Sequence, residues 1–376
     1  MSVSCALFFQ SLIKNDIGFF TGVPDSLLKD ICAYINDNSS TASHIIAANE
    51  GGAVALACGY HLSTGKIPLV YLQNSGLGNV INPLLSLADK EVYSIPLVFM
   101  IGWRGEPGVK DEPQHKKQGR VQNSMLEVME VPFYIFDPEQ SIDHQISKAI
   151  KQAAESSAPV ALVIREGSFE PYVAKVNSNE DDLVLTRELA IQEIIEAAGD
   201  EYFVVSTTGK SSRELYEYRQ RFNKESENDF LIVGGMGHAS QIALGLALNS
   251  SRKVLCLDGD GAAIMHLGAF AITGSTCNRH FLHILINNGA HESVGGQPTA
   301  GFKISFTGIA NSCGYTEAKT VTDATGIRDE ISRLKQINAP VLLEVRVKCG
   351  SRKELGRPKT TPADNKLKLM QTVVNS

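Results

Sequence analysis

The sequence of 376 residues predicts an α/β protein made of two doubly wound parallel-sheet domains. Three observations support this fold class. Short apolar runs of strand length alternate with segments whose apolar residues recur at helical spacing. Many of these runs are apolar throughout, as expected for strands that helices cover on both faces of a parallel sheet. A polar stretch at residues 165–182 divides the chain into two halves of similar length, and each half has the same alternation.

The first half is expected to contain a short strand at residues 17–20, a turn at 22–26 and then a helix with apolar residues at helical spacing. Small residues and glycines predict a second helix after the next strand. A polar, glycine-rich loop at 73–79 follows the third strand, and a longer loop at 102–120 follows the fourth. Loops of that length are often functional lids. The expected strands of this half are residues 17–20, 45–47, 67–72, 96–101 and 160–164.

The second half repeats the alternation, with its most apolar runs in the middle of the domain. Its expected strands are residues 203–205, 230–233, 254–257, 281–286 and 341–347. The resulting domain plan is a first domain, a linker, a second domain and a basic tail. Their predicted limits are residues 1–170, 171–183, 184–350 and 351–376.

The composition argues against several classes of protein. It is 43% hydrophobic and 20% charged, as in ordinary globular proteins, and the net charge of −6 gives no basic field for nucleic acid. No apolar run reaches the length of a membrane span, and the first residues lack the features of a signal peptide. The seven cysteines are scattered and never form a CxxC pair, which favours reduced thiols. We therefore expect a cytoplasmic protein with no nucleic-acid or membrane partner.

Two strand ends in the second half carry the residue types of an anion and metal site. The strand at 254–257 runs into Asp258-Gly259-Asp260-Gly261, and the next one ends in Asn287-Asn288-Gly289. Parallel strands present their carboxyl ends at one edge of the sheet, where ligands bind in open α/β folds. The glycines permit close backbone approach to an anion, while carboxylate and amide oxygens suit Mg²⁺. These two strand ends therefore predict a metal and diphosphate site.

The combination of Gly-Asp-Gly, a gap and Asn-Asn resembles the signature of thiamine-diphosphate enzymes. The step from Asp260 to Asn288 is 288 − 260 = 28 positions, enough for one crossover helix and a strand. The resemblance implies a pyrimidine-binding domain followed by a diphosphate-binding domain, with thiamine diphosphate and Mg²⁺ as cofactors. It also implies metal ligation by Asp260, Asn288 and the Ala290 carbonyl. Counting alone leaves Asn287 and Asn288 both open, and the family pattern of a ligand two residues before the carbonyl ligand favours Asn288.

The first half extends this resemblance through the segment ASHIIAANEGGAVALACGYHLSTGK. Glu50 occupies the position of a family glutamate that hydrogen-bonds the pyrimidine ring and helps to remove the thiazolium proton. Without the second-half motif, Glu50 would be read as an ordinary first-turn acid favoured by the helix dipole. In the second half, Met236 resembles the apolar residue that wedges under the cofactor, although methionine also fills cores generally. The full predicted cofactor-binding set is Glu50, Thr208, Gly209, Gly235, Met236, Gly259, Asp260, Gly261, Ala262 and Asn288.

Two domains without a third between them resemble the phosphonopyruvate decarboxylase family, with the sulfopyruvate decarboxylases as near relatives. The segments that carry this likeness include FFTGVPDSLLKD, GWRGEPGVKDEPQHKKQGR and INNGAHESVGGQPT. The resemblance implies decarboxylation of 3-phosphonopyruvate to phosphonoacetaldehyde and CO₂ in phosphonate biosynthesis. It also implies at least a homodimer, with active sites at the subunit interface. Asp25 and His115 resemble the acid and histidine that handle protons in related decarboxylases.

The substrate would carry a carboxylate and a phosphonate, which need cations and hydrogen-bond donors. The loop at 102–120 and the tail supply candidates, although charged runs of this kind are also common on solvated surfaces. The predicted substrate-binding residues are Arg104, Arg120, Arg352 and Arg357.

Three alternatives stay open at this point. A sulfopyruvate decarboxylase would use the same catalytic residues on a sulfonate. A nicotinamide-dependent oxidoreductase would need a GxGxxG fingerprint, but Gly261 is followed by Ala262 and no third glycine. A non-catalytic cofactor-binding module would be expected to lack Glu50, Asp260 or Asn288, and all three are present.

Overall fold

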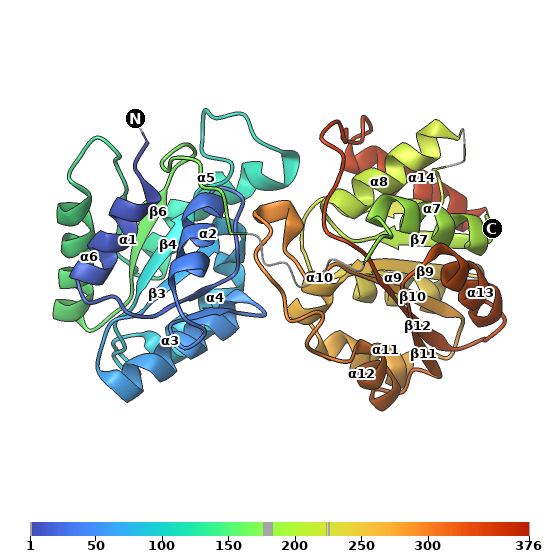
Figure 1. Ribbon diagram of the computed structural model, residues 1–376, viewed down its shortest axis with the longest axis horizontal. Helices are drawn as coiled ribbons and strands as arrows, with labels where there is room; N and C mark the ends of the chain where they lie inside the picture. The colour runs from blue at the N-terminus through green and yellow to red at the C-terminus, as the bar shows by residue number, and fades with distance from the viewer. Residues whose placement is uncertain (1, 176–182, 223, 225, 376) are drawn as a thin grey trace. The chain divides into compact units, whose positions relative to one another are not determined.

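The computed structural model describes residues 2–175, 183–222, 224 and 226–375. They form two compact units. Unit 1 comprises Met1–Asn177 with Ser293–Gln297, and unit 2 comprises Ser178–Glu292 with Pro298–Ser376. Residues 176–182 of the predicted linker lie outside the described residues. Each unit contains one parallel six-stranded sheet with helices on both faces (Figure 1), so the predicted fold class is confirmed.

The sheet of unit 1 has the strand order β2-β1-β3-β4-β6-β5, with every pair parallel. Its strands are β1 (Phe20–Gly22), β2 (His44–Ile46), β3 (Leu69–Gln73), β4 (Val98–Gly102), β5 (Phe133–Ile135) and β6 (Val160–Ile164). Its helices are α1 (Cys5–Lys14), α2 (Lys29–Asn38), α3 (Glu50–Thr64), α4 (Leu77–Pro83), α5 (Pro113–Val128) and α6 (Ile142–Ser156), with the short turns η1 (Asn74–Gly76) and η2 (Leu84–Ala88).

Successive side chains of a strand point to opposite faces, so an apolar strand supplies two cores at once. In β3, Tyr71 belongs to the apolar cluster formed with α1, α2 and α6, and Val70 belongs to the one formed with α3, α4 and α5. This explains why the central strands of unit 1 are apolar throughout rather than alternating.

The sheet of unit 2 has the order β11-β12-β10-β9-β7-β8, again all parallel. Its strands are β7 (Tyr202–Ser206), β8 (Asp229–Leu231), β9 (Lys253–Gly259), β10 (Phe281–Asn287), β11 (Glu317–Val321) and β12 (Pro340–Arg346). Its helices are α7 (Arg187–Ala198), α8 (Lys210–Arg221), α9 (Ala239–Asn249), α10 (Asp260–Met265), α11 (Gly268–Thr276), α12 (Phe306–Ser312), α13 (Ala324–Leu334) and α14 (Pro362–Val374), with the turn η3 (Glu292–Val294). Helices α7, α8 and α13 pack on one face, while α9, α11 and α12 pack on the other.

Three sequence-based expectations for individual elements need correction. The first strand begins at Phe20 and ends at Gly22, so the range 17–20 was placed too early. Residues 113–120 of the expected long loop form the first half of α5, which Pro113 opens at a position where its missing N–H costs nothing. The edge strands β5 and β11 were not predicted. Within the described residues, no helix is both long and apolar enough to cross a membrane.

Candidate functional site

Glu50 lies at the carboxyl edge of the unit 1 sheet, as the first residue of α3. The chain leaves β2, and Asn49 caps the helix by accepting a hydrogen bond from the Gly52 N–H at 2.8 Å. The Glu50 side chain is buried, with 6% of its surface exposed. Asn79 donates to its Oε2 at 2.6 Å, and no ion pair to Glu50 is found in the described part of the chain. The carboxyl group is therefore held by a neutral donor.

The carboxyl group of Glu50 packs directly against Gly76. A Cβ at that position would lie 2.3 Å from Glu50 Oε1 and 2.6 Å from its carboxyl carbon. The backbone of Gly76 has φ −76° and ψ −8°, which any residue can adopt. The glycine is therefore needed for space rather than for conformation.

Asp25 follows β1 at the same edge and is completely buried. Its Oδ2 lies over Gly102, where a Cβ would be 2.0 Å away, and it has no hydrogen-bond partner among the described residues. Burial raises the pKa of Asp25 to about 6, although the nearby Arg104 guanidinium opposes that rise. A carboxyl group with this pKa can change protonation near neutral pH.

Arg104 follows β4 and is fixed by its neighbours. Its Nε donates to Asp111 Oδ2 at 2.8 Å, its Nη2 to Asp111 Oδ1 at 2.5 Å, and its Nη1 to Ser26 Oγ at 2.5 Å. The Gly105 N–H adds a further bond to Asp111 at 2.8 Å. The predicted substrate-binding arginine is thus part of an ion pair that shapes the loop after β4.

His115 lies in the first turn of α5. Its Nδ1 is buried and has no hydrogen-bond partner among the described residues. Burial, helped by the Arg104 charge, lowers the pKa of His115 to about 4, so the imidazole is neutral at pH 7. The structure therefore brings Asp25, Arg104 and His115 to one edge of unit 1. Arg120 lies further along α5 and is exposed.

In unit 2, Asp260 is the first residue of α10 and follows β9 directly. It is 3% exposed, and Thr299 donates its hydroxyl hydrogen to Oδ2. Burial raises the pKa of Asp260 to about 6, while this bond and the backbone N–H groups of Asn288 and Gly261 oppose the rise. No Lys or Arg pairs with Asp260 within the described ranges. A buried carboxylate without a cationic partner is a natural ligand for a metal ion.

The two asparagines at the end of β10 differ in how their amides are used. Asn287 Nδ2 donates to Gly301 O at 2.9 Å and to Glu344 Oε1 at 2.8 Å, and its Oδ1 accepts from the Gly289 N–H at 3.1 Å. Asn288 Nδ2 donates to Glu292 Oε2 at 3.0 Å, and within the described residues its Oδ1 accepts one hydrogen bond, from the Ala290 N–H at 3.1 Å. The Asn288 oxygen therefore keeps a lone pair for a further partner.

The remaining predicted cofactor residues lie on neighbouring turns of unit 2. Thr208 and Gly209 link β7 to α8, and Gly209 has φ 86°. Gly235, with φ 72°, and Met236 precede α9. The Met236 methyl carbon is 3.4 Å from where a Cβ of Gly261 would lie, so this methionine packs against the Gly-Asp-Gly turn. Gly259 and Ala262 flank the same turn.

The oxygen atoms at the ends of β9 and β10 fit a divalent cation, and the glycine turns beside them fit a diphosphate. The hard oxygens of Asp260, Asn288 and Ala290 match the preference of Mg²⁺, and the pKa of Asp260 shows that its negative charge lacks a partner. A Cβ at Gly301 would lie 2.6 Å from Asp260 Oδ2 and 2.5 Å from Asn287 Oδ1, so the turn also closes tightly behind these ligands. In unit 1, the buried carboxyl group of Glu50, which Asn79 holds, fits the pyrimidine contact.

The tail residues have other partners. Arg352 Nε donates to Glu188 Oε2 at 2.8 Å, and its Nη2 donates to Glu217. These two carboxylates already satisfy the guanidinium, so its predicted role in substrate binding stays a prediction. The predicted role of Arg357 in substrate binding also stays a prediction.

Sequence reasoning missed a buried charge network around Asn288. Glu292 accepts from Arg187 and Lys210 as well as from Asn288, and Arg187 also pairs with Glu214. These residues lie up to 105 positions apart. Only a buried arginine at the start of α7 could have signalled the network, and burial is not visible in sequence. Thr299, Gly76 and Asn79 were missed for the same reason.

Comparisons with known proteins agree with this arrangement. A family model described as the thiamine pyrophosphate enzyme N-terminal TPP binding domain matches residues 5–126, and the C-terminal TPP binding domain model matches residues 207–345. A phosphonopyruvate decarboxylase of Streptomyces viridochromogenes is 32% identical over 358 residues, covering 91% of this chain and 88% of that protein. One from Streptomyces hygroscopicus is 31% identical, covering 91% and 86%. A sulfopyruvate decarboxylase of Methanosarcina acetivorans is 27% identical, covering 90% and 89%.

Proposed function

The chain belongs to the phosphonopyruvate decarboxylase family of thiamine pyrophosphate enzymes, and from this premise we propose that it converts 3-phosphonopyruvate to phosphonoacetaldehyde and CO₂ without oxidation. The observation that carries this proposal is the likeness to two phosphonopyruvate decarboxylases along nearly the whole chain. The sulfopyruvate decarboxylase of similar coverage is less similar, at 27% identity. The sulfonate substrate is therefore the second candidate.

Thiamine diphosphate, when bound, supplies the nucleophilic carbon and the electron sink that decarboxylation of a 2-oxo acid requires. Asp260, Asn288 and the Ala290 carbonyl would hold Mg²⁺, which would supply positive charge for the diphosphate. The turns at Thr208–Gly209 and Gly235–Met236 would bind the diphosphate through their backbone N–H groups. Their glycines, with positive φ, allow the close approach that this requires.

Glu50 would contact the pyrimidine ring and share a proton with it. Its position supports this role because the carboxyl group is buried, has one neutral donor in Asn79 and rests against Gly76. No competing cation holds the Glu50 oxygens in the described part of the chain, so they can form a hydrogen bond with the pyrimidine ring.

Asp25 and His115 would handle the proton that replaces CO₂. The pKa of about 6 for Asp25 leaves a protonated fraction near neutral pH, and the pKa of about 4 for His115 leaves a neutral imidazole. An acid and a neutral acceptor that both lie near Arg104 suit proton delivery. Arg104 lies beside them, and with Arg120 it is the proposed cation for the substrate's anionic groups.

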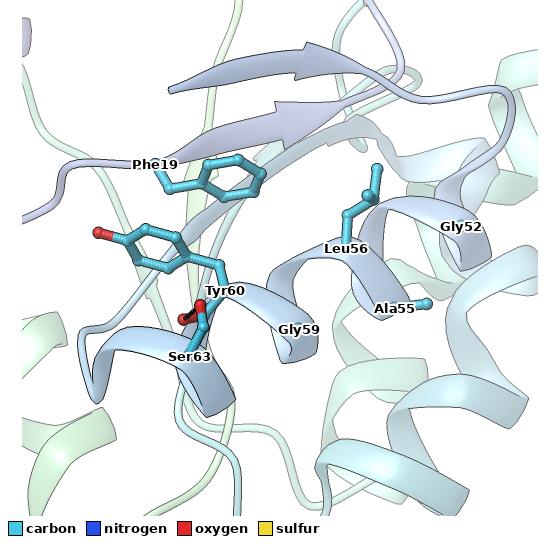
Figure 2. Close-up of a pocket in the computed structure, with 7 residues that line it drawn as sticks. All are labelled: Phe19, Gly52, Ala55, Leu56, Gly59, Tyr60 and Ser63. Atoms are coloured by element: carbon cyan, nitrogen blue, oxygen red, sulfur yellow. Dashed lines mark hydrogen bonds between the residues drawn. The ribbon is translucent and has the colours of Figure 1, made fainter. Parts of the chain in front are cut away.

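We also propose a homodimer or larger homo-oligomer in a cytoplasmic setting. On helix α3, Leu56 is 37% exposed and shares one surface with Gly52, Ala55, Gly59 and Ser63, while Leu62, elsewhere on the helix, is 75% exposed. A shallow pocket of about 470 Å³ lies on this helix, with the stacked rings of Phe19 and Tyr60 at one end (Figure 2). An exposed apolar surface on the helix whose first residue is Glu50 suits a second copy of the chain, because the contact would remove apolar area from water. The seven scattered cysteines suit a reducing compartment.

The test is an assay of CO₂ and aldehyde release from phosphonopyruvate, with and without added thiamine diphosphate and Mg²⁺. Turnover that depends on the cofactor and exceeds turnover of sulfopyruvate supports the proposal. A strong preference for sulfopyruvate would instead show that the protein is a sulfopyruvate decarboxylase. Absence of turnover with either acid would support a non-catalytic cofactor-binding protein instead.

A further inference from the structure

Asn288 and Asp260 have different surroundings although both are proposed metal ligands. Among the residues that the structure describes, Asp260 accepts from a hydroxyl group and from backbone N–H groups, whereas the Asn288 amide nitrogen donates to a carboxylate, Glu292 Oε2, at 3.0 Å. An asparagine side chain has a donor end and an acceptor end that can exchange by a simple flip. A partner that accepts but cannot donate decides which end faces it. Ionised Glu292 is such a partner.

Glu292 is itself held on both oxygens. Arg187 Nη1 donates to Oε2 at 2.5 Å and Lys210 Nζ donates to Oε1 at 2.8 Å. Arg187 is in turn fixed by Glu214, at 2.7 Å and 2.9 Å from its Nε and Nη2. The side chains of Arg187, Glu214 and Glu292 are 6%, 2% and 12% exposed. The network contains two cations and two carboxylates, so it is neutral and its geometry is fixed by charge-assisted bonds.

From this geometry we infer that Glu292 is a positioning residue, which turns the Asn288 amide so that its oxygen faces the divalent cation. The inference rests on the proposed function, because it takes Asn288 to be a metal ligand. The NH₂ group of Asn288 points to Glu292, so Oδ1 points away from it, towards the turn that also contains Ala290. Outer partners of this kind typically change metal affinity by about 10–100-fold when removed.

The inference predicts different effects for two substitutions of the same residue. Glu292→Ala removes the acceptor and leaves the Asn288 amide with the weaker restraint of the Ala290 N–H, so affinity for the cation falls by about tenfold or more. In Glu292→Gln, Arg187 can only donate and therefore holds the new amide oxygen where it also accepts from Asn288, so affinity should stay within about threefold of wild type. Glu330→Ala removes a partly exposed carboxylate of α13 and serves as the control, with no expected change.

The experiment titrates the full-length protein with Mn²⁺ at saturating thiamine diphosphate, with free Mn²⁺ counted by electron paramagnetic resonance. Asp260→Ala is included as a reference variant. Weak binding by Glu292→Ala with near-normal binding by Glu292→Gln supports the inference. Normal binding by Glu292→Ala overturns it, and so does equally weak binding by Glu292→Gln, which would assign the effect to charge.

The reference variant separates this inference from the proposed function. If Asp260→Ala binds Mn²⁺ normally, the metal site is misplaced and both fail. If Asp260→Ala loses binding while Glu292→Ala keeps it, the inference fails alone. Should Glu292→Ala not fold, Glu292→Asp replaces it, because the shorter side chain keeps the charge but withdraws the oxygen from Asn288. The same loss is then expected, and normal binding overturns the inference.

Discussion

Glu50 is buried, yet within the described residues it forms no ion pair and is held by Asn79. Glu50→Gln keeps the size and can still accept the Asn79 hydrogen bond, but it cannot exchange a proton. We expect it to bind thiamine diphosphate within about tenfold of wild type while kcat falls at least about 100-fold. Calorimetric titration with the cofactor and a CO₂ release assay measure the two quantities. Glu130→Gln, at an exposed position of unit 1, is the control, and near-normal turnover of Glu50→Gln would remove Glu50 from the mechanism.

Asp25 makes a pH-dependent contribution to stability. Burial raises its pKa from 3.8 to about 6 in the folded protein, so the folded state binds this proton more tightly than the unfolded state. The stabilisation is complete below about pH 4 and is lost as pH rises through about 6. The difference in free energy of unfolding is up to about 3 kcal/mol for a shift of this size.

The corresponding prediction concerns Asp25→Asn, which cannot ionise. The free energy of unfolding of the variant, relative to that of the wild type, should rise by up to about 3 kcal/mol between pH 4 and pH 7.5. The reason is that only the wild type has a buried proton to lose over this range. Urea unfolding at the two pH values measures this difference, and other titrating groups cancel in the comparison. Asp329→Asn, exposed on α13, should show no such gain. If the free energy of unfolding depends on pH in the same way for the wild type and Asp25→Asn, then Asp25 does not have the raised pKa that its burial implies.

At the scale of elements, the turn between β3 and α4 sets the position of Glu50. A methyl group at Gly76 would lie 2.3 Å from Glu50 Oε1, while one at Gly78 meets no atom within 4 Å. Gly76→Ala should therefore displace the carboxyl group and lower kcat/KM at least about tenfold, whereas Gly78→Ala should stay within about twofold of wild type. Steady-state kinetics on the matched pair checks this, with circular dichroism to confirm folding. Equal activity of the two variants would show that Glu50 tolerates displacement.

The strands that carry the site could be predicted, whereas two of the four edge strands, β5 and β11, could not. The apolar runs before Asp260 and Asn288 form β9 and β10, the paired central strands of unit 2, because burial on both faces leaves a clear pattern. The strand β11 reads Glu-Ala-Lys-Thr-Val and is partly exposed at the sheet edge, so it lacks that pattern. In the same way β5 contains three residues and is only half-buried. Edge strands are fixed by pairing with a neighbour, which the local sequence does not contain.

The candidate site shows the same division. Glycines and acids at strand ends are local features, so Glu50, Asp260 and the Asn287-Asn288 pair could be found from sequence. The partners that orient them come from distant segments: Gly76 faces Glu50, Thr299 donates to Asp260, and Glu292 binds Arg187 across 105 positions. Such contacts depend on the packing of whole helices and sheets. For Arg104 the sequence indicated the charge but not the bidentate bond to Asp111, and its role in substrate binding stays a prediction.

At the scale of the whole molecule, each unit holds one part of the proposed machinery. Unit 1 contains Glu50 and Asp25, and unit 2 contains Asp260 and Asn288. If one chain supplies Glu50 and its partner supplies Asp260 to each active site, two inactive variants can complement each other. In a symmetric dimer, both sites use the same pair of surfaces. A mixed dimer of Glu50→Gln and Asp260→Ala would then contain one site with both substitutions and one site with neither.

Mixing the two inactive variants should therefore restore activity. With random exchange about half of the dimers are mixed, and one of the two sites in each is intact, so about a quarter of wild-type activity is expected. The variants are mixed after mild dissociation or produced together, and the whole mixture is assayed for CO₂ release. If the mixed dimer is first isolated by separate tags, about half of wild-type activity is expected, because one of its two sites is intact. Each variant dissociated and reassociated alone is the control. If active sites were formed within single chains, every site would carry one of the substitutions, and the mixture would stay as inactive as its components.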